Sequence, residues 1–181
     1  RLRVASPKLY YSISVTTRKP RVGEQEGVHY FFVDTERFEQ MLDKDLFLEY
    51  AIYCDNYYGT PIEPVEEALA NGQNVILEID VQGALTVKKR MPEAIMVFII
   101  PPDFSYLERR LRIRATELPE IIKQRVEAAR HEYALAEKFD YIVINDDIDL
   151  AVCEMIAIMQ AEDCKYDKRK EYIERVINYD A

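Results

Sequence analysis

The sequence predicts an α/β protein with a parallel central sheet and a smaller antiparallel lobe. Apolar and β-branched runs of strand length alternate with longer segments of helical spacing through most of the chain, which is typical of a parallel sheet covered by helices. Ile95–Ile100 is apolar at every position, as expected of a strand that is buried on both faces of such a sheet. In contrast, Tyr10–Ala51 holds closely spaced strands with little helix between them, which indicates the separate lobe.

Three strands and one helix are predicted within this lobe. The strands are runs rich in aromatic and β-branched residues. The helix begins after Asp34, whose carboxylate is a good N-cap for the apolar residues that follow at helical spacing. The predicted strands are Tyr10–Val15, Val28–Val33 and Leu46–Ala51.

The helix after the lobe is predicted to open with a capping box. Thr60 and Glu63 stand three positions apart, and Pro61 occupies the position expected for the first helical residue. We expect this helix to end near Asn71-Gly72, because Asn and Gly readily take the backbone conformation that ends a helix.

The remaining elements alternate between strand and helix. A strand over Asn74–Asp80 ends in a carboxylate, and the helix after it, Val81–Arg90, is ended by Met91-Pro92. Ligands of parallel α/β folds bind beyond the carboxyl ends of the strands, where Asp80 lies. The later predicted elements are a helical region from Phe104 to Lys138, a strand Tyr141–Ile144, a helix Ile148–Cys164 and a short charged helix after it.

The composition is that of one soluble domain and disfavours several classes of function. The 181 residues carry 24 Lys and Arg against 33 Asp and Glu, a net charge of −9, which argues against nucleic-acid binding. No apolar run is long enough to span a membrane. Three cysteines without zinc or CxxC spacing predict reduced thiols and a cytoplasmic protein. His29 and His131 lack metal-ligand companions, so no metal site is predicted, and the sequence predicts no oligomeric state.

A compact anion site is predicted within residues 12–24. Arg18 and Arg21 stand three positions apart, among hydroxyl residues and beside Pro20. Guanidinium groups bind phosphate oxygens in bidentate fashion and stay charged at any working pH. A solvated basic turn is the alternative, but the negative net charge and the concentration of hydroxyls weigh against it.

From this segment onward the chain resembles the guanylate kinase family. Residues 12–24 read Ser-x-Ser-x-Thr-Thr-Arg-x-Pro-Arg-x-Gly-Glu, which is similar to the GMP-binding motif of that family. No single segment carries the resemblance, but many matching segments follow in the same order over about residues 8 to 164. They are 27–33, Phe47–Tyr50, Asn56–Thr60, Leu77–Ala84, Pro101-Pro102, Arg109–Glu117 and Ile144–Asp147.

The resemblance implies a P-loop kinase-like fold and the phosphorylation of GMP by ATP with Mg²⁺. The implied fold is a three-layer core around a parallel sheet, with a small mixed or antiparallel GMP-binding lobe and a helical lid, all in one domain over residues 1–181. The implied boundaries are about 12–62 for the lobe, 1–11 and 63–181 for the core, and about 109–126 for the lid.

The resemblance also implies which residues bind GMP. Arginines and tyrosine hydroxyls are expected to hold its phosphate, and a carboxylate with two hydroxyls to read the guanine edges. Asp80 is expected near the transferring phosphate, where it helps to organise magnesium waters or the base. The implied phosphate ligands are Arg18, Arg21, Tyr30 and Tyr58, and the implied guanine ligands are Ser14, Glu49 and Thr60.

Glu49 suits guanine for a chemical reason. Guanine presents adjacent donors at N1 and at its exocyclic amine, and a carboxylate is a strong acceptor for both. Adenine has no donor at N1 and would leave the carboxylate unpaired, at a cost of roughly 1–3 kcal/mol or more. Without the resemblance, Glu49 would be read as an ordinary exposed carboxylate on a strand.

A second cluster of arginines resembles the lid that closes over ATP. Arg110 and Arg114 lie four residues apart and so share one helical face, while a solvated face paired to nearby Glu is the alternative. Ala115 stands where the family usually has Gly. Asn145 resembles the residue that contacts adenine, and a helix cap before Ile148 is the alternative. The implied ATP ligands are Arg110, Arg114 and Asn145, and the implied catalytic set is Arg18, Asp80, Arg110, Arg114 and Arg125.

The phosphate loop G-x-x-x-x-G-K-[ST], which such an enzyme needs, does not occur in the 181 residues. In the family this loop precedes the segment that begins here at Arg1, and the chain starts without Met, so we expect the loop in a preceding segment. The alternative is a catalytically inactive module of this fold that binds GMP or a protein. Both arginine clusters are intact, which favours the enzyme.

Overall fold

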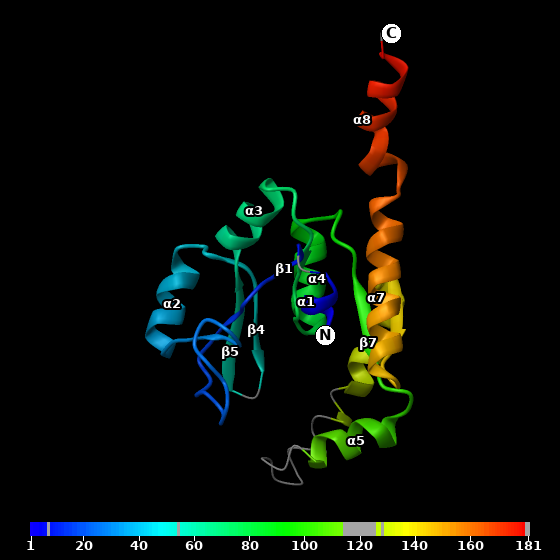
Figure 1. Ribbon diagram of the computed structural model, residues 1–181. Coiled ribbons are helices and arrows are strands. Elements are labelled where there is room, and N and C mark those ends of the chain that lie inside the picture. The colour runs from blue at the N-terminus through cyan, green and yellow to red at the C-terminus, as the bar shows by residue number, and fades with distance from the viewer. Residues whose placement is uncertain (7, 54, 114–125, 128, 180–181) are drawn as a thin grey trace. The chain divides into compact units, whose positions relative to one another are not determined.

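The computed structural model describes residues 1–6, 8–53, 55–113, 126–127 and 129–179, in two compact units (Figure 1). The first unit comprises Pro7–Met96 with Glu137–Asp140, and the second comprises Arg1–Ser6, Val97–Ala136 and Tyr141–Ala181. The division of the chain into a lobe, a core and a lid stays a prediction.

Two sheets form the framework of the first unit. A parallel pair joins β1 (Tyr10–Tyr11) to β6 (Val75–Ile76). The larger sheet has the order β3-β2-β5-β4, in which β2 pairs parallel with β3 and antiparallel with β5, and β5 pairs antiparallel with β4. The lobe sheet is therefore mixed, in accord with the sequence prediction. Its strands are β2 (Val15–Thr16), β3 (Phe31–Phe32), β4 (Phe47–Tyr53) and β5 (Asn56–Pro61).

The prediction of one strand over Tyr10–Val15 is wrong, because this segment passes from one sheet to the other. Tyr10 and Tyr11 pair with β6, and the amide of Ser12 still donates to Ile76 O at 3.0 Å. The chain then leaves the parallel pair and enters the mixed sheet at Val15. The strand predicted over Val28–Val33 is also shorter, since Gly27, at φ +68°, forms a turn in which its amide donates to Tyr30 O at 2.9 Å.

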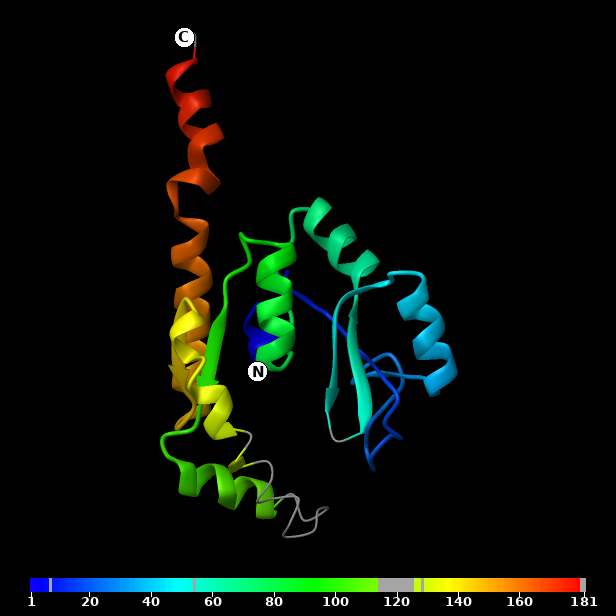
Figure 2. The same ribbon diagram turned by 180° about the vertical axis from the view of Figure 1, so that it is seen from behind.

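Helix α2 (Thr35–Asp43) covers one face of the mixed sheet, as both views of the ribbon show (Figure 2). The Asp34 carboxylate accepts from the amide of Arg37 at 2.8 Å, which confirms the predicted cap. Phe38 is fully buried and stacks on Phe47, and with Val15 these rings form the core of the lobe. Because these apolar side chains bury one face of the mixed sheet against α2, polar residues of the sheet are left to the opposite face.

The predicted capping box of α3 (Ile62–Ala70) is wrong. Pro61 is the N-cap residue and makes no side-chain cap bond, because Thr60 belongs to β5 and its hydroxyl bonds to Glu49 instead. The end of the helix is as predicted, with Asn71 as the C-cap and Gly72 at φ +70°.

Helix α4 has the predicted bounds, Val81–Arg90, and packs on β4. Asp80 is its N-cap and accepts from the amide of Gly83 at 2.7 Å. Val87 on this helix forms a second core with Leu48 of β4 and Val65 of α3. These contacts hold α4, whose first turn follows Asp80, against β4, the strand that carries Glu49.

In the second unit, β7 (Val97–Ile100) pairs parallel with β8 (Tyr141–Ile144) and α7 (Ile148–Asp163) packs on β8. The predicted strands and helix are confirmed, with Asp147 rather than Asn145 as the N-cap of α7. Burial on both faces of the apolar strand is not observed, because Phe98 is buried whereas Ile99 is 53% exposed. The other elements here are α1 (Leu2–Ala5), α5 (Phe104–Ile113) and α8 (Tyr166–Ile177), and a 3₁₀ turn Ala136–Lys138 lies where the two units join in sequence.

No helix in the part of the chain that the structure describes has both the length and the apolar character needed to cross a membrane. Cys153 and Cys164 are exposed thiols outside any disulfide, and Cys54 lies outside the described residues.

Candidate active site

Two residues predicted to read guanine lie side by side across the mixed sheet. Glu49 of β4 is the register partner of Thr60 of β5. Directly opposed residues point to the same face of a sheet, so Thr60 and Glu49 form a polar pair. Ser14, the third predicted guanine ligand, directly precedes β2, whose Val15 pairs with Gly59 of β5.

A β-bulge at Leu48 turns Glu49 to this face. The register shifts between Phe47, which pairs with Pro61, and Glu49, which pairs with Thr60. In a regular strand, Phe47 and Glu49 would share a face, because side chains alternate with period 2. The extra residue lets Phe47 enter the core beneath α2 while Glu49 faces away from it. The guanidinium of Arg90 donates to the carbonyls of Phe47 and Leu48, at 2.8 and 3.0 Å, and so holds the backbone at the bulge.

The Glu49 carboxylate is buried, and its surroundings raise its pKa. The residue is 5% exposed, and its Oε1 accepts from the Thr60 hydroxyl at 2.5 Å. Burial raises the pKa of Glu49 above its ordinary value, and the charge of Asp80 raises it further, whereas the bond from Thr60 acts in the opposite direction. A ligand that brings donors to this carboxylate would favour its charged form.

Asp80 lies beside Glu49, at the start of α4. Its Oδ1 accepts from the amide of Gly83, so part of its acceptor capacity is used to cap the helix. The position of Asp80 near the guanine-reading residues agrees with where the resemblance puts it, and its predicted role toward the transferring phosphate stays a prediction.

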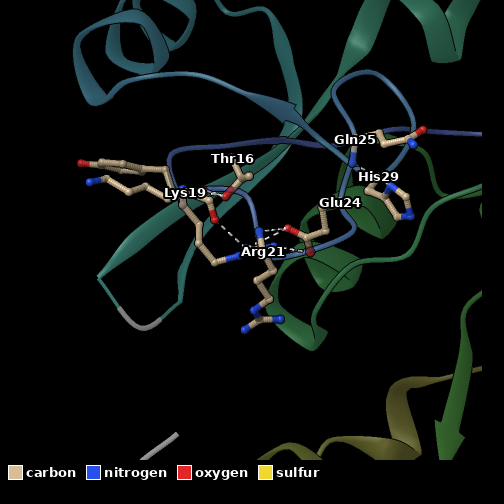
Figure 3. Close-up of polar contacts among 8 residues, drawn as sticks. Thr16, Lys19, Arg21, Glu24, Gln25 and His29 are labelled. Atoms are coloured by element: carbon tan, nitrogen blue, oxygen red, sulfur yellow. Dashed lines mark hydrogen bonds and ion pairs between the residues drawn. The ribbon is translucent and has the colours of Figure 1, made fainter. Parts of the chain in front are cut away.

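The loop after β2 carries a cluster of polar contacts that includes Lys19, Arg21 and Glu24 (Figure 3). The Arg18 guanidinium makes two parallel bonds to the Glu24 carboxylate, at 2.9 and 3.0 Å, and a third to Lys19 O at 2.8 Å. Glu24 also accepts from the backbone amide of Arg21 at 2.7 Å, and in Figure 3 its carboxylate is turned toward that residue. These bonds raise the pKa of Arg18 and lower that of Glu24, so both stay charged.

Two tyrosines complete the basic end of the site. Tyr30 and Tyr58 meet edge to face with ring centroids 6.0 Å apart, and the Arg18 guanidinium lies 5.4 Å from the centre of the Tyr30 ring. Tyr58 also hydrogen-bonds to Arg18. Burial raises the pKa of Tyr30, so its hydroxyl keeps its proton at neutral pH and can donate to an anion.

The first unit therefore contains all eight residues that were predicted to bind GMP. One end of the group offers buried carboxylate and hydroxyl oxygens, and the other offers a guanidinium and phenolic donors. This arrangement suits a ligand with hydrogen-bond donors at one end and an anionic group at the other. The eight residues are Ser14, Arg18, Arg21, Tyr30, Glu49, Tyr58, Thr60 and Asp80.

The residues predicted to bind ATP are less fully described. Arg110 belongs to α5, but its side chain, and all of Arg114 and Arg125, lie outside the described residues. Asn145 directly follows β8, and its amide donates to Ile100 O at 2.7 Å. Its side-chain Oδ1 is buried without a hydrogen-bond partner among the described atoms. Such an acceptor suits an amine donor from a ligand, and the exocyclic amine of adenine is one.

Within the described ranges, no three His, Cys, Asp or Glu side chains come together as a metal ion would require.

Sequence reasoning gave no role to Glu24, Gly83 or Arg90, although the structure brings all three to the site. Glu24 could have been found from the sequence, since it lies within the arginine segment. Gly83 and Arg90 act through the packing of α4 on β4, which no local pattern in the sequence reports.

The comparisons with known proteins identify the family and the fold. The guanylate kinase family profile matches residues 2–162. The chain is 52% identical over 171 residues to a guanylate kinase of Carboxydothermus hydrogenoformans, covering 94% of this chain and 83% of that protein. It is 48% identical over 173 residues to a guanylate kinase of Thermus thermophilus, covering 96% and 79%. The crystal structure of guanylate kinase from Anaplasma phagocytophilum matches with a TM-score of 0.82 and 30% identity over 98% of this chain and 89% of that one, which confirms the predicted fold class.

Proposed function

Because the chain belongs to the guanylate kinase family, we propose that it transfers the γ-phosphoryl group of ATP to the phosphate of GMP, forming ADP and GDP. The relatives carry the name guanylate kinase, and their similarity extends over most of this chain. None of these comparisons supports the alternative of an inactive binding module. A nucleoside monophosphate kinase needs one site for the acceptor nucleotide and one for ATP.

The observation that carries the acceptor assignment is the buried pair of Glu49 and Thr60. A carboxylate that is 5% exposed costs free energy unless donors satisfy it, and Thr60 supplies donors through its hydroxyl and its backbone. The guanine base presents two adjacent donors, at N1 and the exocyclic amine, and so matches the remaining acceptor capacity of Glu49. Ser14 and Thr60 would then lie along the O6 and N7 edge of the base.

At the other end of the site, Arg18 and Arg21 would hold the GMP phosphate. The Arg18 guanidinium bonds to Glu24, Lys19 and Tyr58, which fixes its plane. The donors that remain, with the hydroxyls of Tyr30 and Tyr58, would bind phosphate oxygens. Catalysis would consist of aligning this phosphate with the donor phosphate and neutralising charge, without a covalent intermediate.

On the ATP side, we propose roles for Arg110, Arg114 and Arg125 at the phosphates and for Asn145 at adenine. Magnesium would accompany ATP, with Asp80 near its bound waters. Closure of the lobes would exclude water and so limit the hydrolysis of ATP. A cytoplasmic location would suit this substrate pair and the reduced thiols.

An assay of ADP release with MgATP and GMP, combined with calorimetric GMP binding on the same sample, tests the proposal. GMP-dependent ADP release, with little release when AMP replaces GMP, is the expected result. GMP binding without any ADP release would support the acceptor site and would leave the binding module as the alternative. If GMP does not bind, the acceptor assignment is wrong.

A further inference from the structure

Gly83 lies in the first turn of α4, in contact with the Glu49 carboxylate. A methyl group placed on its Cα would lie 2.5 Å from Glu49 Oε2 and 3.1 Å from Glu49 Cδ. It would also lie 3.3 Å from Asp80 Oδ1. Position 83 therefore has no room for any side chain while both carboxylates keep their places.

The backbone does not explain why glycine occupies this position. The described glycines with positive φ are Gly23, Gly27 and Gly72, and Gly83 is not among them. Gly83 lies within a regular helix, where alanine is favoured over glycine. The space taken by the Glu49 carboxylate is the feature that excludes a side chain here.

The Glu49 carboxylate can yield only by leaving its place in the site. Its Oε1 is held by the Thr60 hydroxyl at 2.5 Å, and the residue is buried. Asp80 cannot withdraw freely either, because its Oδ1 accepts from the amide of Gly83 itself at 2.7 Å. A methyl group at position 83 would thus displace the Glu49 carboxylate from the position in which it bonds to Thr60.

The close approach also places the Glu49 carboxylate against the first turn of a ten-residue helix. The amino end of a helix carries partial positive charge, which stabilises a nearby anion. This contact offsets part of the cost of ionising a buried carboxyl group.

We propose that Gly83 is a positioning residue for the recognition of guanine: it admits the Glu49 carboxylate to the first turn of α4 and holds it in line with Thr60. The inference rests on the proposed function, since it concerns how the carboxylate of the GMP site is placed. Gly83 acts through Glu49 and would not itself touch the base.

The test compares calorimetric GMP binding to the unsubstituted protein, Gly83→Ala, Glu49→Ala and the double variant. Gly83→Ala is expected to weaken GMP binding by about tenfold, the scale of one charged hydrogen bond. In the Glu49→Ala background, the same substitution is expected to have no further effect, because the group it displaces is gone. Thr86→Ala, at an exposed position of the same helix, is the control and should leave GMP binding unchanged.

The outcomes distinguish a positioning role of Gly83 from an effect on packing alone. Equal effects of Gly83→Ala in both backgrounds would mean that the residue acts by packing alone, and this would overturn the inference. Unchanged GMP binding by Gly83→Ala would do the same. If Gly83→Ala fails to fold, the double variant decides: folding like Glu49→Ala supports the steric conflict, and failure to fold refutes it. If the unsubstituted protein binds no GMP, the proposed function itself fails.

Discussion

The hydroxyl of Thr60 donates to Oε1 of Glu49 across 2.5 Å, between neighbouring strands of the lobe sheet. In the sequence, Thr60 has the spacing of a helix N-cap, yet α3 begins after Pro61 without any side-chain cap bond. The hydroxyl thus serves the buried carboxylate rather than the helix. This allocation is consistent with the role in GMP binding that we propose for the pair.

Replacing Thr60 by Val, which keeps the shape and removes the hydroxyl, should weaken GMP binding and reduce stability. A buried charged acceptor that loses a partner costs roughly 1–3 kcal/mol. The pKa of Glu49 should also rise further, because the lost bond favours the charged form. Chemical denaturation and calorimetry measure the two effects, and Thr86→Val serves as the control. Full stability and affinity in Thr60→Val would show that this bond is dispensable.

The raised pKa of Glu49 predicts opposite pH trends for stability and for ligand binding. The folded protein retains the proton to a higher pH than the unfolded chain, whose glutamates titrate near 4.5. The contribution of this group to stability is therefore full below that value and is lost as pH rises through the folded-state pKa. Guanine binding needs the charged form and should strengthen over the same interval.

Guanosine is the better ligand for this measurement, because a phosphate monoester itself titrates with a pKa of about 6. Guanosine affinity should rise with pH above the range of an ordinary glutamate and then level off. In Glu49→Gln the same curve should be flat, since no carboxyl group titrates at that position. A guanosine curve that is already flat in the unsubstituted protein would contradict the role given to Glu49.

Arg18→Ala should separate binding of the phosphate from binding of the base. Removal of charge-assisted bonds of roughly 1.5–3 kcal/mol should weaken GMP binding by about one to two orders of magnitude. Guanosine, which lacks the phosphate, should bind as tightly as it does to the unsubstituted protein. Calorimetry with both ligands gives the comparison. Equal losses for the two ligands would show that Arg18 supports the lobe as a whole rather than the phosphate.

The sequence predicted those features that depend on local spacing. The N-cap at Asp34 and the bounds of α4 were correct, because a cap acts within one turn of its own helix. The split of Tyr10–Val15 between two sheets was missed, because strand propensity does not say which partner a strand takes.

The placement of Glu49 could not be derived from the residue pattern alone. Regular alternation puts Phe47 and Glu49 on one face, and only the bulge at Leu48 separates them. A bulge depends on the pairing of two strands and on the helix packed against them, neither of which is visible in a single segment. The resemblance to a known family selected Glu49 without this knowledge, while the reason for its orientation came from the structure.

Arg90 provides the test of how that orientation is maintained. Its guanidinium donates to the carbonyls of Phe47 and Leu48, on the two residues before Glu49. Arg90→Met keeps most of the aliphatic stem but leaves both carbonyls without this donor, so stability should fall by roughly 1–3 kcal/mol. GMP binding should weaken as well, because the bulge that turns Glu49 toward the site is then held less firmly.

The exposed neighbour Lys89 gives the matched control, since Lys89→Met removes a charge from the same helix without touching β4. Denaturant titration and calorimetry of both variants distinguish two possibilities. A parallel loss of stability and GMP affinity in Arg90→Met alone would support the coupling of α4 to Glu49 through the bulge. A loss of stability with GMP affinity intact would mean that core packing around Leu48 sets the bulge by itself, and that Arg90 only strengthens the fold.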